Sequence, residues 1–169
     1  MTPEHLHLAM NHIPFLGAGF ALVPLLIGLL SGQKNTVLVG LLIAALSGWS
    51  MPLVMETGEA AYERYENGPV TSHLDPAFNE SLEIHEHRAE NWAIALYANA
   101  AAATLGLAIL IWRPRHARAV AFVGMLFCIA SLLAGIWIAE SGGKIRRPDF
   151  RTALESQSKN SASVPLSIF

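Results

Sequence analysis

The chain has 169 residues, of which 53% are apolar and only 14% are charged, and its formal net charge is −2 at pH 7. A soluble domain carries about 25% charged residues, so this composition excludes an ordinary soluble enzyme and favours an integral membrane protein. The charge balance offers no basic surface for nucleic acid, and we expect membrane lipid and other proteins as partners instead.

Four apolar stretches are long enough to cross a bilayer, which takes about 20 residues. They cover residues 13–30, 37–55, 92–112 and 119–139, and none of them contains Asp, Glu, Lys or Arg. The first stretch has no basic segment before it and exceeds the apolar core of about 7–15 residues in a signal peptide. We therefore expect all four to be retained as transmembrane helices.

The first predicted helix begins at His7 or Ile13 and ends at Leu30. Pro14 suits its first turn, where the missing N–H costs no hydrogen bond. Pro24 lies deeper and is expected to kink the helix, because proline removes one backbone hydrogen bond.

A short polar turn over residues 31–35 leads into the second helix, which ends near residues 55–59. The long connection that follows, residues 59–90, carries eight acidic residues and two arginines. We expect a loop on the membrane surface, with short helices over residues 60–66 and 76–90.

The third helix begins at Glu83 or Trp92 and ends at Trp112, and a tight basic turn over residues 113–118 leads into the fourth. Residues 144–169 form a polar, Ser-rich tail, which we expect to be extended.

The two short turns are basic and contain no acid: Lys34 lies in the first and three arginines lie in the second. Basic short loops favour the cytoplasm, so the chain is predicted to span the bacterial inner membrane with both termini and the acidic connection in the periplasm. The tail argues the opposite, because it carries five basic residues against two acidic ones.

Two short patterns return along the chain. The motif H-x-H-x-A-x-N begins at His5 and again at His85, and M-E-T-G-E after the second span aligns with A-E-S-G-G after the fourth, 84 residues later. Two crossings bring the chain back to its starting side, so the copies are parallel repeats. The predicted fold is an all-α integral membrane protein: one four-transmembrane-helix bundle over residues 1–143, made of hairpin repeats 5–59 and 85–143.

This topology gathers titratable side chains at one membrane face. One interpretation is that they are ordinary polar residues of the membrane interface; a doubled cluster from four helices favours a site instead. The cluster comprises His5, His7, His12, His85, His87, Glu56, Glu59 and Glu140.

Imidazole is a common ligand of haem iron, and b-type haem needs one histidine from each of two helices. The lone cysteine, Cys128, and the lack of C-x-x-C-H exclude covalent c-type haem. His7 and His12 lie about 140° apart on a regular helix, and His85 and His87 point to nearly opposite sides, so only one of each pair can face the centre. Candidate cofactor-binding residues are therefore His7, His12, His85 and His87, with His12 and His87 favoured as ligands of the haem iron. Candidate proton-handling and supporting residues are Glu56, Glu140, Asn11 and Asn91.

Two other chemistries stay open. A metal ion could be held by histidine together with Glu56 and Glu140, although the Glu-x-x-His pairs typical of di-iron bundles are incomplete. Histidine and glutamate at the interface could also accept protons during quinol oxidation.

The segment H-L-A-M-N-H-I-P-F resembles the opening of a family of small bacterial membrane proteins known as domain of unknown function 2231. His7, His12 and Pro14 match the family pattern H-P-x-x-V-H-F-P, Leu8 replaces its first proline, and Thr57-Gly58 fits the end of the second helix. The resemblance implies a four-helix membrane protein associated with haem or redox chemistry, with no established reaction. The histidines it implicates are His7, His12 and one of His85 or His87.

The leading hypothesis is a membrane electron-transfer subunit that binds b-type haem near the outer face of a larger redox complex. Its acidic connection would dock a basic periplasmic partner such as a cytochrome, and we expect no enzymatic activity from the chain alone. The alternative is a non-catalytic anchor or assembly subunit. A transporter is less favoured, because charged residues are missing at mid-membrane depth.

Overall fold

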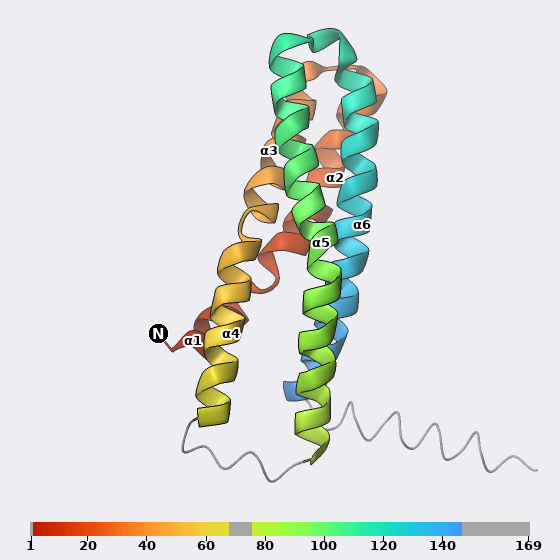
Figure 1. The fold of residues 1–169 in the computed structure, drawn as a ribbon. Helices are drawn as coiled ribbons and strands as arrows, with labels where there is room; N and C mark the ends of the chain where they lie inside the picture. The colour runs from red at the N-terminus through yellow and green to blue at the C-terminus, as the bar shows by residue number, and fades with distance from the viewer. Residues whose placement is uncertain (1, 68–75, 147–169) are drawn as a thin grey trace, which may run out of the picture.

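The computed structural model describes residues 2–67 and 76–146, and the regular secondary structure of these two ranges is entirely helical (Figure 1). The elements are α1 (Pro3–Met10), α2 (Ile13–Ser31), α3 (Lys34–Gly48), α4 (Met51–Asn67), α5 (Pro76–Trp112), the 3₁₀ turn η2 (Pro114–His116) and α6 (Ala117–Arg146).

Four helical segments are long and apolar enough to cross a membrane, as the sequence predicted. They are Pro3–Ser31, Lys34–Asn67, Phe78–Trp112 and Pro114–Ile145. The first is interrupted between α1 and α2, beside its histidines, and the second between α3 and α4, while α5 is continuous. Pro14 and Pro52 lie in the first turn of the helix after each interruption, the position where proline fits best. The helix continues through Pro24.

Many small side chains lie between the helices, beside a few fully buried large ones such as Leu25 and Leu41, and many other large apolar side chains point outward. The buried core includes Ala18, Ala21, Ala44, Ala100, Ala103 and Ala121. Phe20, Ile94 and Trp112 are 68%, 71% and 83% exposed. Membrane bundles show this arrangement, because small residues let helices approach closely while lipid covers the outer face. At Gly40, for example, an added Cβ would lie 2.7 Å from Leu25, so α2 and α3 touch there.

Residues 60–66 and 76–90 of the acidic connection are helical, as expected, but they continue the long helices α4 and α5 instead of forming separate short helices. α4 continues to Asn67 and α5 begins at Pro76; residues 68–75 lie outside the described part. The 37 residues of α5 span about 55 Å, whereas the hydrocarbon core is about 30 Å thick. The acidic residues in the described part of this connection therefore lie on helices, and α5 is longer than the hydrocarbon core of a bilayer is thick.

Residues 144–146, which were predicted as the start of the polar tail, belong to α6. The predicted extension of residues 147–169 lies outside the described part.

The two short turns lie at the same end of the bundle, as expected. Gly32, in the α2–α3 turn with φ of 73°, faces the guanidinium of Arg118 at the start of α6. At the opposite end α1 packs on α4, and α5 packs on α6, so two helix pairs stand beside each other (Figure 1). The histidine-rich segments belong to these two pairs.

Candidate histidine site

His7 connects the first helix pair. Its Nδ1 donates a hydrogen bond to the carbonyl oxygen of Val54, 3.1 Å away on α4, and lies 3.5 Å from the hydroxyl of Thr57. Helix α1 begins at Pro3 and carries His7 on the side that faces α4. The imidazole is half-buried there.

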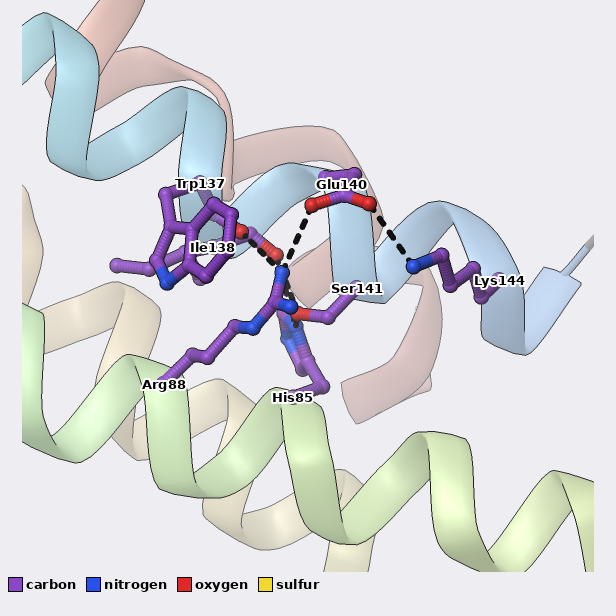
Figure 2. A network of polar contacts seen from close by, with 7 residues as sticks. All are labelled: His85, Arg88, Trp137, Ile138, Glu140, Ser141 and Lys144. Atoms are coloured by element: carbon purple, nitrogen blue, oxygen red, sulfur yellow. Dashed lines mark hydrogen bonds and ion pairs between the residues drawn. The ribbon is translucent and has the colours of Figure 1, made fainter. Parts of the chain in front are cut away.

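His85 connects the second helix pair in the same way (Figure 2). Its Nδ1 donates to the carbonyl oxygen of Ile138 at 3.2 Å and lies 3.1 Å from the hydroxyl of Ser141, both on α6. This imidazole is also half-buried. Its supporting residues stand 84 positions after Val54 and Thr57, whereas the histidines themselves are 78 positions apart.

A hydrogen-bonding argument gives the tautomer of both rings. A backbone carbonyl can only accept a hydrogen bond, so the ring nitrogen facing Val54 or Ile138 must carry the proton. In the neutral ring Nε2 is then the nitrogen with the lone pair. Both histidines thus present a potential ligand atom at Nε2.

Glycines lie against the two rings. An added Cβ at Gly58 would lie 3.0 Å from Cε1 of His7, and one at Gly142 would lie 3.1 Å from Cε1 of His85. The edge of each imidazole between Nδ1 and Cε1 therefore rests directly on the neighbouring helix.

The other predicted histidines lie at the surface. His12 is exposed in the short segment between α1 and α2, beside the side chain of Asn11 and 5.5 Å from the ring of Phe15. His87 is exposed on α5, with the amide of Asn91 3.2 Å from both ring nitrogens. The sequence motif paired His7 with His87, but the residue with contacts corresponding to those of His7 is His85.

The two predicted glutamates differ in their surroundings. Glu56 is exposed on α4. Glu140 accepts hydrogen bonds from Arg88 at 2.9 Å and Lys144 at 2.8 Å (Figure 2). Glu140 is therefore held in a network of two ion pairs, while Glu56 is not.

Arg88 makes further contacts that the sequence did not suggest. Its guanidinium donates to the carbonyl oxygen of Trp137 at 2.9 Å and lies 3.8 Å from the centre of the Trp137 ring. It is one turn after His85 on the same face of α5. Sequence reasoning also missed Thr57 and Ser141 as histidine partners, although the match between T-G and S-G at an offset of 84 was the available signal.

A multi-ligand metal centre is not seen in the described residues, where no three His, Cys, Asp or Glu side chains gather closely enough to hold an ion. This leaves the expected site of histidine with Glu56 and Glu140 without support. A site made from two imidazoles needs no such cluster.

Comparison with known proteins adds no relative: no family model, curated protein or solved structure matches the chain. Function is therefore argued from the chemistry of the side chains, since a helical bundle alone implies none.

Proposed function

We propose that the protein is a membrane electron-transfer subunit that binds b-type haem through His7 and His85. The observation that carries the proposal is the matched setting of these two imidazoles. Each is fixed at Nδ1 by a backbone carbonyl on the partner helix of its own pair, at 3.1 and 3.2 Å.

Such a setting suits a metal ligand. Histidines that bind metals usually donate the second ring N–H to a carbonyl or carboxylate, which fixes the ring and makes the ligating nitrogen more basic. Haem iron takes axial ligands of this kind, and bound haem supplies one-electron transfer. His7 and His85 would hold it between the two helix pairs, and the apolar bundle would exclude water on one side.

His7 and His85 are favoured over His12 and His87 because of burial and contacts. His12 and His87 are exposed and lie beside Asn11 and Asn91. A flexible amide holds a ring less firmly than a helix carbonyl, so these residues are better suited to the membrane interface.

The proposal includes insertion in the bacterial inner membrane with both termini in the periplasm. The basic turns support this orientation. It predicts that a membrane-impermeant thiol reagent labels the Glu59→Cys protein in intact cells but not the protein with Lys34→Cys. The reverse pattern would refute this orientation.

We also propose that the chain works with other subunits and has no catalytic activity alone. The acidic ends of α4 and α5 project beyond the apolar spans and offer a negative surface for a basic partner, such as a periplasmic cytochrome. The resemblance to domain of unknown function 2231 is compatible with such a subunit.

A second candidate function is that of a non-catalytic anchor. The same hydrogen bonds favour it, because each histidine ties one helix to its partner. This function requires a colourless protein in which replacing His7 or His85 lowers stability without changing any redox property. Quinone or proton handling by Glu140 is disfavoured by its two cationic partners.

The deciding experiment is an ultraviolet–visible spectrum of the detergent-purified protein, oxidised and then reduced, after expression with haem supply. We expect a Soret band that is lost in the His7→Ala and His85→Ala proteins. The matched controls His12→Ala and His87→Ala should keep it. A colourless protein would refute the proposal, and loss of the band only in the two control proteins would refute the choice of ligands.

A further inference from the structure

We propose that two hydroxyl–glycine pairs, Thr57-Gly58 and Ser141-Gly142, are positioning residues that hold the two histidines with Nε2 directed away from the supporting helix. The inference rests on the proposed function for its purpose, but the ring orientation can be measured without any cofactor. The pairs occupy matching places on α4 and α6.

The hydroxyl protons of Thr57 and Ser141 are used within their own helices. Thr57 donates to the carbonyl oxygens of Leu53 at 2.8 Å and Val54 at 3.0 Å, and Ser141 donates to Ile138 at 2.7 Å. Serine and threonine often bond the preceding turn of their own helix in this way. Because the proton is committed there, each hydroxyl can meet an imidazole only as an acceptor.

Oxygen acceptors lie beside the Nδ1 atom of both rings. At His85 the hydroxyl of Ser141 and the carbonyl oxygen of Ile138 lie 3.1 and 3.2 Å from Nδ1, so two acceptors face one N–H. At His7 the carbonyl oxygen is the closer acceptor, at 3.1 Å against 3.5 Å for the hydroxyl of Thr57. Both arrangements select the Nδ1–H tautomer, and the hydroxyl matters more at His85.

Gly142 lies against the ring of His85 and leaves no room for a side chain. A Cβ at position 142 would lie 3.1 Å from Cε1 and 3.3 Å from Nδ1 of His85 but 3.7 Å from Nε2. Contacts between 3.0 and 3.4 Å are tighter than those of nearly all real Cβ atoms, so an alanine would push the ring by a few tenths of an ångström. The adjacent Gly143 has no atom within 4 Å of its added Cβ. Of these two neighbouring glycines, only Gly142 must lack a side chain to leave room for the ring of His85.

The occurrence of the same arrangement twice separates a positioning role from ordinary helix packing. A hydroxyl, a carbonyl three residues earlier and a following glycine surround His7 and His85 alike. The glycine distances to Cε1 agree within 0.1 Å, 3.0 against 3.1 Å. Helix packing alone requires no hydroxyl beside a glycine at both sites.

The test is nitrogen-15 NMR of the histidine rings in the purified full chain at a pH where they are neutral. The His7→Gln and His85→Gln proteins would assign the two signals. We expect the Nδ1–H pattern for both rings. Ser141→Ala should lower the Nδ1–H to Nε2–H ratio of His85 about threefold to tenfold, the equivalent of one neutral hydrogen bond. Thr57→Val should have a smaller effect on His7, and Thr57→Ser should restore the ratio.

A second measurement uses neighbouring glycines as a matched pair. Gly142→Ala should shift the Cε1–H resonance of His85, whereas Gly143→Ala should leave it unchanged. An Nε2–H pattern for both rings, or no response to Ser141→Ala and Gly142→Ala, would overturn the positioning role. If the Nδ1–H pattern responds as expected in a protein that binds no haem, the positioning role stands while the electron-transfer proposal fails.

Discussion

Removing the guanidinium of Arg88 should destabilise the protein far more than removing the exposed guanidinium of Arg64. Arg88 has a side chain only 17% exposed, pairs with Glu140 at 2.9 Å, donates to the carbonyl oxygen of Trp137 and lies over the Trp137 ring (Figure 2). Arg64 pairs with Glu4 at 3.1 Å, and these side chains are 57% and 44% exposed.

The magnitude follows from adding these contacts. A cation over an aromatic ring contributes about 0.5–1 kcal/mol at exposed sites and about 2 kcal/mol when desolvated. A hydrogen bond to a charged group contributes about 1.5–3 kcal/mol. The ion pair itself adds little, because Glu140 is 46% exposed and keeps Lys144 as a partner. We expect Arg88→Ala to cost about 2–5 kcal/mol and Arg64→Ala to cost less than about 1 kcal/mol.

The assay is the thermal midpoint of the detergent-purified proteins. At about 2–4 °C per kcal/mol for a chain of this size, Arg88→Ala should lower Tm by about 4–20 °C and Arg64→Ala by less than about 4 °C. Arg88→Lys should lie between Arg88→Ala and the unaltered protein, because lysine keeps the charge but loses the planar fork. Equal losses for Arg88→Ala and Arg64→Ala would refute the reasoning that burial and stacking decide the effect.

Three further substitutions test the packing by the same assay. Gly135→Ala should cost about 1–3 kcal/mol through overpacking, because its added Cβ would collide with the side chain of Phe15. The control Gly143→Ala should be neutral or stabilise α6 by up to about 1 kcal/mol. Equal Tm values for these two proteins would contradict the close approach of α2 and α6. Ser131→Ala should leave Tm unchanged or raise it, because the buried Ser131 hydroxyl has no hydrogen-bond partner within the described ranges. A clear drop in Tm would show that the hydroxyl has a bound partner.

The number of spans could be predicted because it depends on a single physical quantity, the length of uncharged apolar sequence. The helix ends could be predicted only in part: the end at Trp112 is as expected and the end at Ser31 is one residue later than expected, whereas α4 and α5 extend into polar sequence. Residues 59–67 and 76–90 are polar but rich in Glu and Ala, which are good helix formers. Polarity therefore ended the apolar span without ending the helix. Sequence polarity reports where a bilayer would end, and helix propensity reports where the helix ends.

The sequence predicted at which end of the bundle the histidines lie, but not which imidazole rings contact another helix. The sequence grouped His7, His12, His85 and His87 at one end by topology. Which of them face another helix depends on helix rotation and on the interruption between α1 and α2, which places His12 outside a regular helix. The assumption of one regular helix therefore did not hold for His12, and it did not identify His7 as the histidine that contacts another helix.

The spacing of the two histidine settings explains why an alignment at constant offset misses them. His7 and Thr57 are 50 residues apart, whereas His85 and Ser141 are 56 residues apart. Aligning the two copies of the H-x-H motif therefore pairs His85 with His5, which is exposed and hydrogen-bonded to Thr2. The two halves differ in length and in helix continuity, yet each brings an imidazole against a hydroxyl followed by glycine. Because the contacts agree where the spacing does not, the orientation of the imidazole is the property that the two halves share. A sequence search for such sites should therefore look for histidine before one span and [Ser/Thr]-Gly after the next, with the separation left variable.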